Sequence, residues 1–329
     1  MDTLTSLLPV FDDVLAAAAR IAPHAHVTPV LRSRSLDALA GAELHFKAEH
    51  LQRVGAFKFR GACNAVWALA PSAAARGVVT HSSGNHGAAL ALAARSRGIP
   101  CHVVVPEGAV PGKLAAIQAY GATLHRCAPT IAAREAACAE LQRDTGAVLV
   151  HPYTDPQVIA GQGTAALELL NACGPLDAVI VPVGGGGLAS GTALAVAALA
   201  PRCRLFVAEP AGADDASRSL QRGERITELV PDTICDGLRG LLGAPNFSLL
   251  RAHGATALTV DDADTAAAMR LLWVRTKQLV EPSSATVLAA LLRHRDMFAG
   301  QRVGLVLSGG NVDLDAIPAM FALASADFS

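Results

Sequence analysis

The sequence predicts an α/β protein of two domains, in which parallel-rich sheets are covered by helices. Short Val/Ile/Leu runs alternate with Ala/Leu-rich amphipathic segments along the 329 residues. Such continuous apolar runs are typical of strands buried on both faces, as in parallel sheets. Polar or glycine-rich loops follow four of the runs, and ligands bind at the carboxyl ends of parallel strands. We therefore expect these loops to share one cleft.

The expected elements divide the chain into two blocks. The strand-like runs lie at residues 77–82, 101–106, 147–152, 177–183, 204–209 and 302–310, and the helix-like segments at 12–20, 60–69, 86–97, 112–120, 130–143, 163–172, 188–199 and 262–279. No linker-like stretch sets the first 77 residues apart from the second block. We predict a large domain made of residues 1–77 and 151–329, and a small, mobile domain made of residues 78–150.

Composition and charge argue against several classes of protein. Hydrophobic residues make up 52% and charged residues 17%, which supplies a large core and argues against disorder. The net charge is −1 and no Lys/Arg block occurs, so we expect no nucleic-acid and no membrane partner. The acidic N-terminus lacks the basic start of a secretory leader, and the seven cysteines form no CxxC pair. We therefore expect a cytoplasmic protein with reduced thiols.

A run of four glycines in "PVGGGGLASG" (182–191) indicates an anion site. Its amides can form a nest at the start of a helix near Leu188, and the loop lacks the GK[ST] ending of a nucleotide P-loop. This favours a single phosphate over a tight turn that needs glycine only for packing. The spacing Gly184-x-Gly186-x-x-Ala189, with Glu209 as a ribose acceptor, also fits a dinucleotide site. An NAD(P)-dependent dehydrogenase is therefore a remote alternative.

The stretch "GAFKFRGA" (55–62) places Lys58 between Phe57 and Phe59. Partial desolvation by aromatic neighbours lowers the pKa of an amine and frees its lone pair to attack a carbonyl. The same pattern also fits a surface lysine whose stem lies along the protein while its amine reaches water.

Two further loops carry polar side chains directly after expected strands. In "HSSGNHG" (81–87), the amides at a helix start together with Ser82, Ser83 and Asn85 suit a carboxylate or an aldehyde oxygen, although Ser83 or Asn85 can instead cap the helix. In "VLSGGN" (306–311), Ser308 stands where its hydroxyl can meet a ring nitrogen without adding charge. An ordinary exit from a strand explains Ser308 equally well.

Taken in order, "FKFRGA", "HSSGNHG", "VPVGGGGL", "VAEPAGADD", "VEPSSA" and "LSGGN" resemble the motifs of fold type II pyridoxal-phosphate enzymes, which share the tryptophan synthase β-like fold. The greatest similarity is to the serine racemase and serine/threonine dehydratase branch, from about residue 28 to residue 314. Two departures are Ala56, where a serine commonly precedes the Phe-Lys pair, and "EPSSATVLAAL" in place of the "EPTAG" pattern.

The resemblance implies roles for particular residues. Lys58 would bind pyridoxal 5'-phosphate covalently and abstract the substrate α-proton. The other cofactor contacts would be Phe57 beside the ring, Asn85 at the ring hydroxyl, Ser308 at the pyridine nitrogen, Glu281 in the surrounding wall, and Gly184, Gly185, Gly186, Gly187 and Leu188 at the phosphate. The substrate would be held by Ser82, Ser83, Gly84, Asn85 and His86, with Arg134 turning toward it when the cleft closes.

The resemblance also implies a divalent-cation site and a homodimer. Its ligands would be Glu209, the carbonyl of Ala213 and Asp215, and hard oxygen ligands of this kind suit Mg²⁺ or Ca²⁺. A helix N-cap formed by the pair Asp214–Asp215 is the simpler alternative.

The expected reaction is dehydration and deamination of a 3-hydroxy amino acid, such as serine, threonine or 3-hydroxyaspartate, to a 2-oxo acid and ammonia. A neutral partner such as Ser308 leaves the pyridine nitrogen largely unprotonated, which favours prompt loss of the β-hydroxyl. The alternative is a serine or aspartate racemase, because Lys58 and Ser83 would lie on opposite faces of the substrate.

Overall fold

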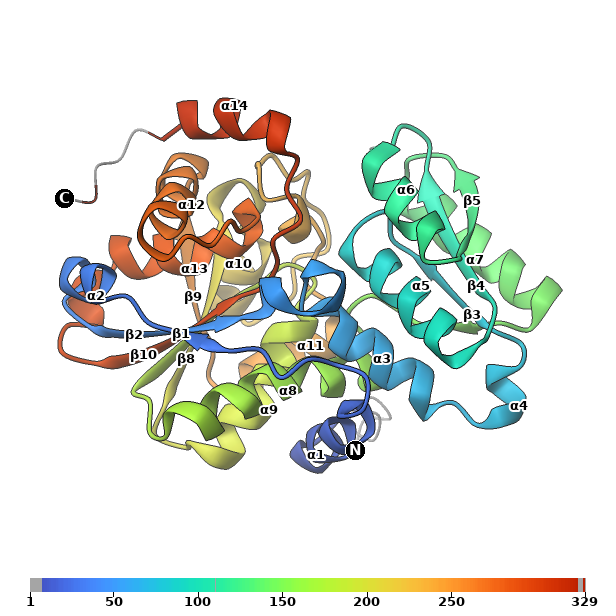
Figure 1. The fold of residues 1–329 in the computed structure, drawn as a ribbon, viewed down its shortest axis with the longest axis horizontal. Helices are drawn as coiled ribbons and strands as arrows, with labels where there is room; N and C mark the ends of the chain where they lie inside the picture. Colours follow the sequence, from blue (N-terminus) through green and yellow to red (C-terminus); the bar gives the residue numbers. More distant parts are fainter. Residues whose placement is uncertain (1–7, 110, 325–327, 329) are drawn as a thin grey trace.

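The structure is a computed structural model that describes residues 8–109, 111–324 and 328. Within these residues, the strands form a six-stranded and a four-stranded sheet, and helices cover both. Figure 1 shows the larger sheet at the left and the smaller one at the right. The predicted α/β class with parallel-rich sheets is confirmed.

The larger sheet has the strand order β1-β2-β10-β7-β8-β9, and all neighbours except β1 and β2 run parallel. Its strands are β1 (Val30–Leu31), β2 (Glu43–Ala48), β7 (Ala178–Pro182), β8 (Arg204–Pro210), β9 (Thr256–Val260) and β10 (Arg302–Leu307). Helices α12 and α13 pack on one face of this sheet, and α8 and α9 on the other. The sheet is therefore buried on both sides, which explains its nearly continuous apolar strands.

The smaller sheet has the order β5-β4-β3-β6, and all of its strands are parallel. They are β3 (Val78–His81), β4 (Cys101–Pro106), β5 (Thr123–Cys127) and β6 (Val148–Leu149). Helices α5 and α6 cover one face of the sheet and α7 the other. The hydrophobic cluster under α7 belongs to this sheet alone, whereas the cluster under α5 and α6 continues into α3.

The helices fill the connections between the strands (Figure 1). They are α1 (Phe11–Ile21), α2 (Arg34–Ala40), α3 (Lys58–Ala68), α4 (Pro71–Ala74), α5 (Asn85–Arg97), α6 (Pro111–Ala119), α7 (Ile131–Thr145), α8 (Pro156–Cys173), α9 (Gly187–Leu199), α10 (Asp215–Arg222), α11 (Ala244–Ala252), α12 (Asp262–Thr276), α13 (Pro282–Arg293) and α14 (Ile317–Ala322). Helix α3 packs against α5 of the smaller half and α8 of the larger half, so its first residue lies where the two halves meet.

The six strand-like runs expected from the sequence all contain strands, but four other strands and several helices were not anticipated. Strand β2 alternates Glu43, His45 and Lys47 with apolar residues, so it lacks the continuous apolar run used to find the others. Helix α13 is buried from Pro282 to Leu292, and a helix buried all round shows no polar face in its sequence.

Two expected helices have different ends in the structure. The segment expected at 163–172 begins at Pro156, because the Asp155 carboxylate caps the amides of Gln157 and Val158. The segment expected at 262–279 ends at Thr276, because Lys277 adopts a left-handed φ of 59°.

Among the helices that the structure describes, none is both long enough and apolar enough to cross a membrane. The residues used to argue against a secretory leader include 1–7, which lie outside the described residues.

Candidate active site

Lys58 is largely enclosed where the two halves of the molecule meet. Its Nζ donates a hydrogen bond of 3.0 Å to the carbonyl of Pro152 and lies 5.2 Å from the centre of the Phe57 ring. Burial lowers the pKa of the Lys58 amine to about 8, although the Glu281 carboxylate opposes this shift. At neutral pH, a larger fraction of such an amine is unprotonated than of a lysine in bulk water, so more of it can act as a nucleophile or accept a proton.

The glycine loop joins β7 to the start of α9 and presents unpaired amide donors. Within the described part of the chain, the backbone N–H groups of residues 184–188 donate to no protein acceptor. They lie at the N-terminus of a 13-residue helix, where the helix dipole also favours negative charge. The loop therefore fits a phosphate group by the chemistry of its donors.

Packing adds a second reason for glycine in this loop. A Cβ on Gly185 would lie 2.4 Å from the Tyr153 ring, and one on Gly184 would lie 2.9 Å from the Leu238 Cα. Gly186 has a φ of 94°, which side chains rarely tolerate. Leu188 follows in the first turn and is buried. Close packing and backbone conformation thus also favour glycine at these positions.

Asn85 links the two halves of the molecule through Glu281. Its Nδ2 donates to both carboxylate oxygens of Glu281, at 3.2 and 3.0 Å, and its Oδ1 accepts from Asn311 Nδ2 at 2.9 Å. Glu281 is 4% exposed, and burial raises its pKa to about 7 while the Asn85 donations oppose this rise. The sequence placed Asn85 and Glu281 in the same site, but it did not reveal this direct contact or the part played by Asn311.

Ser308 and Phe57 lie together at the carboxyl end of β10. The carbonyl of Ser308 accepts the Phe57 amide at 2.9 Å, and Ala56 pairs with Gly309 in an isolated bridge. Ser308 is 2% exposed, and among the described residues its hydroxyl has no hydrogen-bond partner. Its hydroxyl is thus available to a ligand group, as the predicted contact with a ring nitrogen requires.

The loop from Ser82 to His86 joins β3 to α5, and Gly84 is the residue that precedes the helix. The amides of Asn85 and His86 donate to no acceptor among the described residues, which suits a carboxylate at this helix start. The His86 ring is buried beside the Val150 carbonyl, 3.2 Å from Nε2, and burial holds its pKa well below the ordinary value. Among the residues that the structure describes, no side chain caps this helix, so neither Ser83 nor Asn85 acts as its cap.

The predicted cation ligands are in contact with protein amides. Glu209 accepts from the amides of Ala216 at 3.1 Å and Ser217 at 2.5 Å, and Asp215 accepts from the Leu242 amide at 2.7 Å. Burial, together with the charge of Asp215, raises the pKa of Glu209 to about 8. Within the described residues, no cluster of three His, Cys, Asp or Glu side chains forms a metal site. The carbonyl of Ala213 lies in the short turn between these two acids.

Two aromatic residues at the site were not anticipated. His151 and Tyr153 follow β6, and their rings meet edge to face at a centroid distance of 4.6 Å. The ring of Tyr153 lies over Gly185, so close that a side chain at position 185 would clash with it. The only sequence signal was the polar end of the run "AVLVHP", because nothing local indicates which distant glycine a tyrosine will cover.

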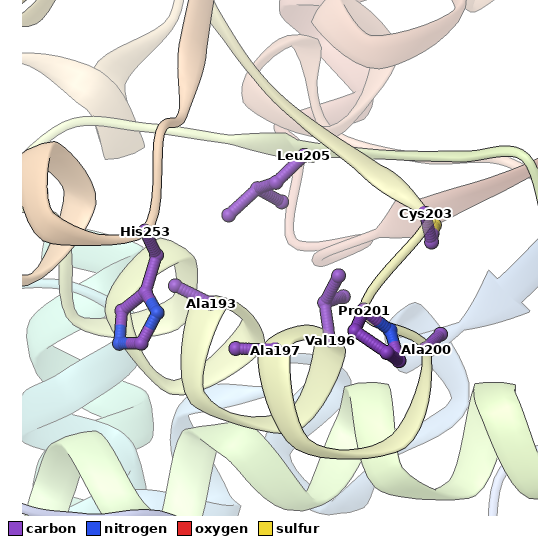
Figure 2. A pocket seen from close by; sticks show the side chains of 8 residues that line it. All are labelled: Ala193, Val196, Ala197, Ala200, Pro201, Cys203, Leu205 and His253. Carbon is purple, nitrogen blue, oxygen red and sulfur yellow. The ribbon is translucent and has the colours of Figure 1, made fainter.

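A separate cavity of 190 Å³ lies at the opposite end of α9 from the glycine loop. Figure 2 shows its walls, which include Val196, Leu205, Cys203 and His253. None of the predicted site residues lines it, so this cavity is not part of the candidate active site.

Comparison with known proteins identifies the class to which this site belongs. The chain matches the family described as "Pyridoxal-phosphate dependent enzyme" over residues 21–309, and it is a member of that family. Pyridoxal phosphate is therefore its cofactor, and the free amides of the glycine loop together with the Lys58 amine fit that group.

Particular relatives cover nearly the whole chain. It is 47% identical over 311 residues to the β-hydroxyaspartate dehydratase of Paracoccus denitrificans, a match that covers 94% of this chain and 99% of that protein. It is also 47% identical over 309 residues to the serine racemase of Dictyostelium discoideum, covering 93% and 95%. The structure of maize serine racemase superimposes with a TM-score of 0.92 at 43% identity, covering 95% and 97%. The dinucleotide interpretation of the glycine loop has no support from these relatives.

Proposed function

We propose that the protein catalyses dehydration and deamination of a 3-hydroxy amino acid to a 2-oxo acid and ammonia. The observation that carries the proposal is Lys58, an enclosed amine with a pKa of about 8 between two sets of unpaired amide donors. Similarity to the dehydratase of Paracoccus denitrificans supports the same reaction.

The chain supplies binding and proton transfer. When bound, pyridoxal phosphate supplies the electron sink that stabilises negative charge at the substrate α-carbon. The amides at the start of α5 hold the α-carboxylate, and those of residues 184–188 hold the cofactor phosphate. Nζ of Lys58 removes the α-proton, and the β-hydroxyl leaves with a proton as water. A second water then replaces nitrogen, so that the 2-oxo acid and ammonia are released.

Ser308 influences how long negative charge persists at the substrate α-carbon before the β-hydroxyl leaves. Its neutral hydroxyl is the group offered to the ring nitrogen, and it carries no charge that would hold a proton there. A cofactor ring without that proton would withdraw electrons from the substrate less strongly. This favours loss of the β-hydroxyl over reprotonation of the α-carbon. This supports dehydration as the main reaction.

Racemisation of serine or aspartate is the second candidate, supported by Ser83 and by the similarity to serine racemases. Ser83 would exchange the α-proton on the face opposite Lys58. Chiral chromatography of recovered L-serine tests this: D-serine should form in the native enzyme and fall at least tenfold in Ser83→Ala, whereas unchanged D-serine would exclude Ser83.

Other features complete the proposal. A divalent cation, Mg²⁺ or Ca²⁺, would be held by Glu209, the Ala213 carbonyl and Asp215. Two features support it: burial raises the pKa of both carboxyl groups, and neither forms an ion pair among the described residues. A homodimer is supported by the family resemblance, and a cytoplasmic location by the seven free cysteines.

We also propose that residues 78–150 form a small domain that moves against the rest. The hydrophobic cluster between its sheet and α7 belongs to this segment alone, whereas the cluster under α5 continues into α3 of the larger half. Polar pairs such as Asn85 with Glu281 and Lys113 with Asp236 also join it to the larger half, and water can replace the partners of such pairs when they separate.

The direct test is the visible absorption spectrum of the purified protein with and without L-serine, L-threonine or 3-hydroxyaspartate. We expect a yellow chromophore that is lost in Lys58→Ala, and 2-oxo acid released with one of the substrates. A Lys58→Ala variant with full turnover would refute the role of this lysine.

A further inference from the structure

Asn246 is buried directly behind the glycine loop. It lies on α11 and is 0% exposed. A Cβ on Gly186 would lie 2.7 Å from the Cβ of Asn246, so the asparagine packs against the backbone of the loop. The amide of Gly243, the residue before α11, also donates to the carbonyl of Gly185 at 3.1 Å. Helix α11 therefore supports the loop through a hydrogen bond and through close packing.

The side-chain amide of Asn246 joins two segments that border the loop. Its Nδ2 donates to the carbonyl of Tyr153 at 3.0 Å and to the hydroxyl of Ser190 at 3.1 Å. Ser190 lies near the start of α9 and is 0% exposed, and its own amide donates to the Gly186 carbonyl at 2.8 Å. The ring of Tyr153 lies over Gly185. Both hydrogens of the amide NH₂ group are thus used to hold neighbours of the glycine loop.

Stability alone does not explain an asparagine at this position. The Oδ1 atom of Asn246 is buried and has no hydrogen-bond partner in the described part of the chain. A buried acceptor without a partner is unfavourable for the folded state. Rotating the amide by half a turn would bring Oδ1 toward the carbonyl oxygen of Tyr153, and two acceptors would then face each other. The side chain is therefore held in the orientation that pairs its two donors, while its acceptor stays unpaired.

The amides of residues 184–188 bind a phosphate well only if their N–H groups point toward one place. Donors arranged in this way depend on the residues that hold their backbone. We propose that Asn246 is a positioning residue for the cofactor phosphate, because it holds the start of α9 through Ser190 and the segment beside the loop through Tyr153. This inference rests on the proposed phosphate site, and it adds a residue that acts through the loop.

A purely structural role for Asn246 is the alternative, and it has a different consequence. An asparagine that only held α11 in place would affect the stability of the protein and the binding of every aldehyde at Lys58 alike. A positioning residue for the phosphate affects only ligands that carry a phosphate. Pyridoxal has the ring and the aldehyde of the cofactor without the phosphate, so the ratio of the two affinities measures the contribution of the loop.

The test is titration of the apoprotein with pyridoxal 5'-phosphate and with pyridoxal, followed by visible absorption. The native protein should bind the phosphorylated ligand at least about 100-fold more tightly than pyridoxal. Asn246→Ala should weaken binding of pyridoxal 5'-phosphate about tenfold and change that of pyridoxal less than about twofold. In the same variant, the ³¹P NMR resonance of the bound cofactor should move toward the position of the free cofactor. Ser190→Ala removes one acceptor only, and it should reduce the ratio of the affinities about threefold even if Asn246→Ala does not fold.

The matched control is Asn64→Ala, because Asn64 on α3 is also 0% exposed and its Nδ2 donates to the carbonyl of Gln157 on α8. This variant should leave the ratio of the two affinities unchanged even where it lowers both. An unchanged ratio in Asn246→Ala and Ser190→Ala, with or without an equal loss for both ligands, would overturn the proposal. A native protein that binds pyridoxal as tightly as pyridoxal 5'-phosphate would refute the phosphate site itself. Absence of 2-oxo acid from every hydroxy amino acid would refute only the dehydration, whatever the ratio of affinities is.

Discussion

Replacing Arg60 with methionine should strongly destabilise the protein. Arg60 lies on α3, the helix that begins with Lys58, and it neutralises the buried carboxylate of Glu49. Arg60 and Glu49 are both 0% exposed, and the guanidinium donates to the two Glu49 oxygens at 2.7 Å each. It also donates to Glu168 on α8 at 2.7 and 2.8 Å. Burial by itself raises the pKa of Glu49, yet Arg60 holds it below its ordinary value.

The magnitude follows from what the variant leaves behind. Glu49 keeps only the Thr28 hydroxyl, at 2.5 Å, and the nearby charge of Lys47. Removing one partner of a buried ion pair costs about 3–5 kcal/mol in the free energy of unfolding. An unfolding entropy of about 2.1 cal/mol/K per residue, taken over the whole chain, converts this to a fall in Tm of roughly 4–7 °C.

The assay is thermal unfolding of the holoenzyme, followed by circular dichroism and by cofactor absorption. Arg60→Met should show the full fall in Tm, and Arg60→Met combined with Glu49→Gln should recover at least half of it, because the buried charge is then removed. A fall below 1 °C in the single variant, or no recovery in the double variant, would refute the reasoning.

Three more predictions follow from the same geometry. The rate at which apoprotein binds pyridoxal phosphate, measured by stopped-flow absorption, should rise about tenfold per pH unit and level off near pH 8. The reason is that the lowered pKa of Lys58 supplies neutral amine at that pH, and a rate that levels off only above pH 10 would contradict the pKa shift. Asn85→Ala should raise the pKa of Glu281 above 7, because the carboxylate loses two hydrogen bonds from Asn85. Titration of the carboxyl infrared bands measures this pKa, and the same value in the variant and the native protein would contradict the effect. Gly191→Ala should lower Tm by about 2–4 °C, because its Cβ would lie 2.4 Å from the Ile159 carbonyl oxygen and force α8 and α9 apart. The control Gly112→Ala has open space around the new Cβ and should leave Tm unchanged. Equal Tm values for the two variants would show that the helices adapt freely.

The sequence by itself determined the α/β class, the six main strand runs and the order of the loops that form the candidate site. These features are local: apolar runs, helix starts and glycine clusters act through the backbone of neighbouring residues. The resemblance built on "FKFRGA", "HSSGNHG" and "VPVGGGGL" led to the family that the comparisons confirm. The roles given there to single residues stay predictions, although the structure brings Lys58, Asn85, Glu281 and Ser308 into one region.

Only the tertiary structure decided which distant groups compensate one another. Strand β2 carries Lys47 and is followed by Glu49, and no local pattern in the sequence indicates that either is buried. Both are buried because Glu168 and Arg60 come from two helices to pair with them. Tyr153 covers Gly185, and Asn311 holds Asn85, across separations that no local pattern records. The physical reason is that burying a charge or a polar group is favourable only when its partner arrives, and the partner is chosen by how the helices and sheets pack.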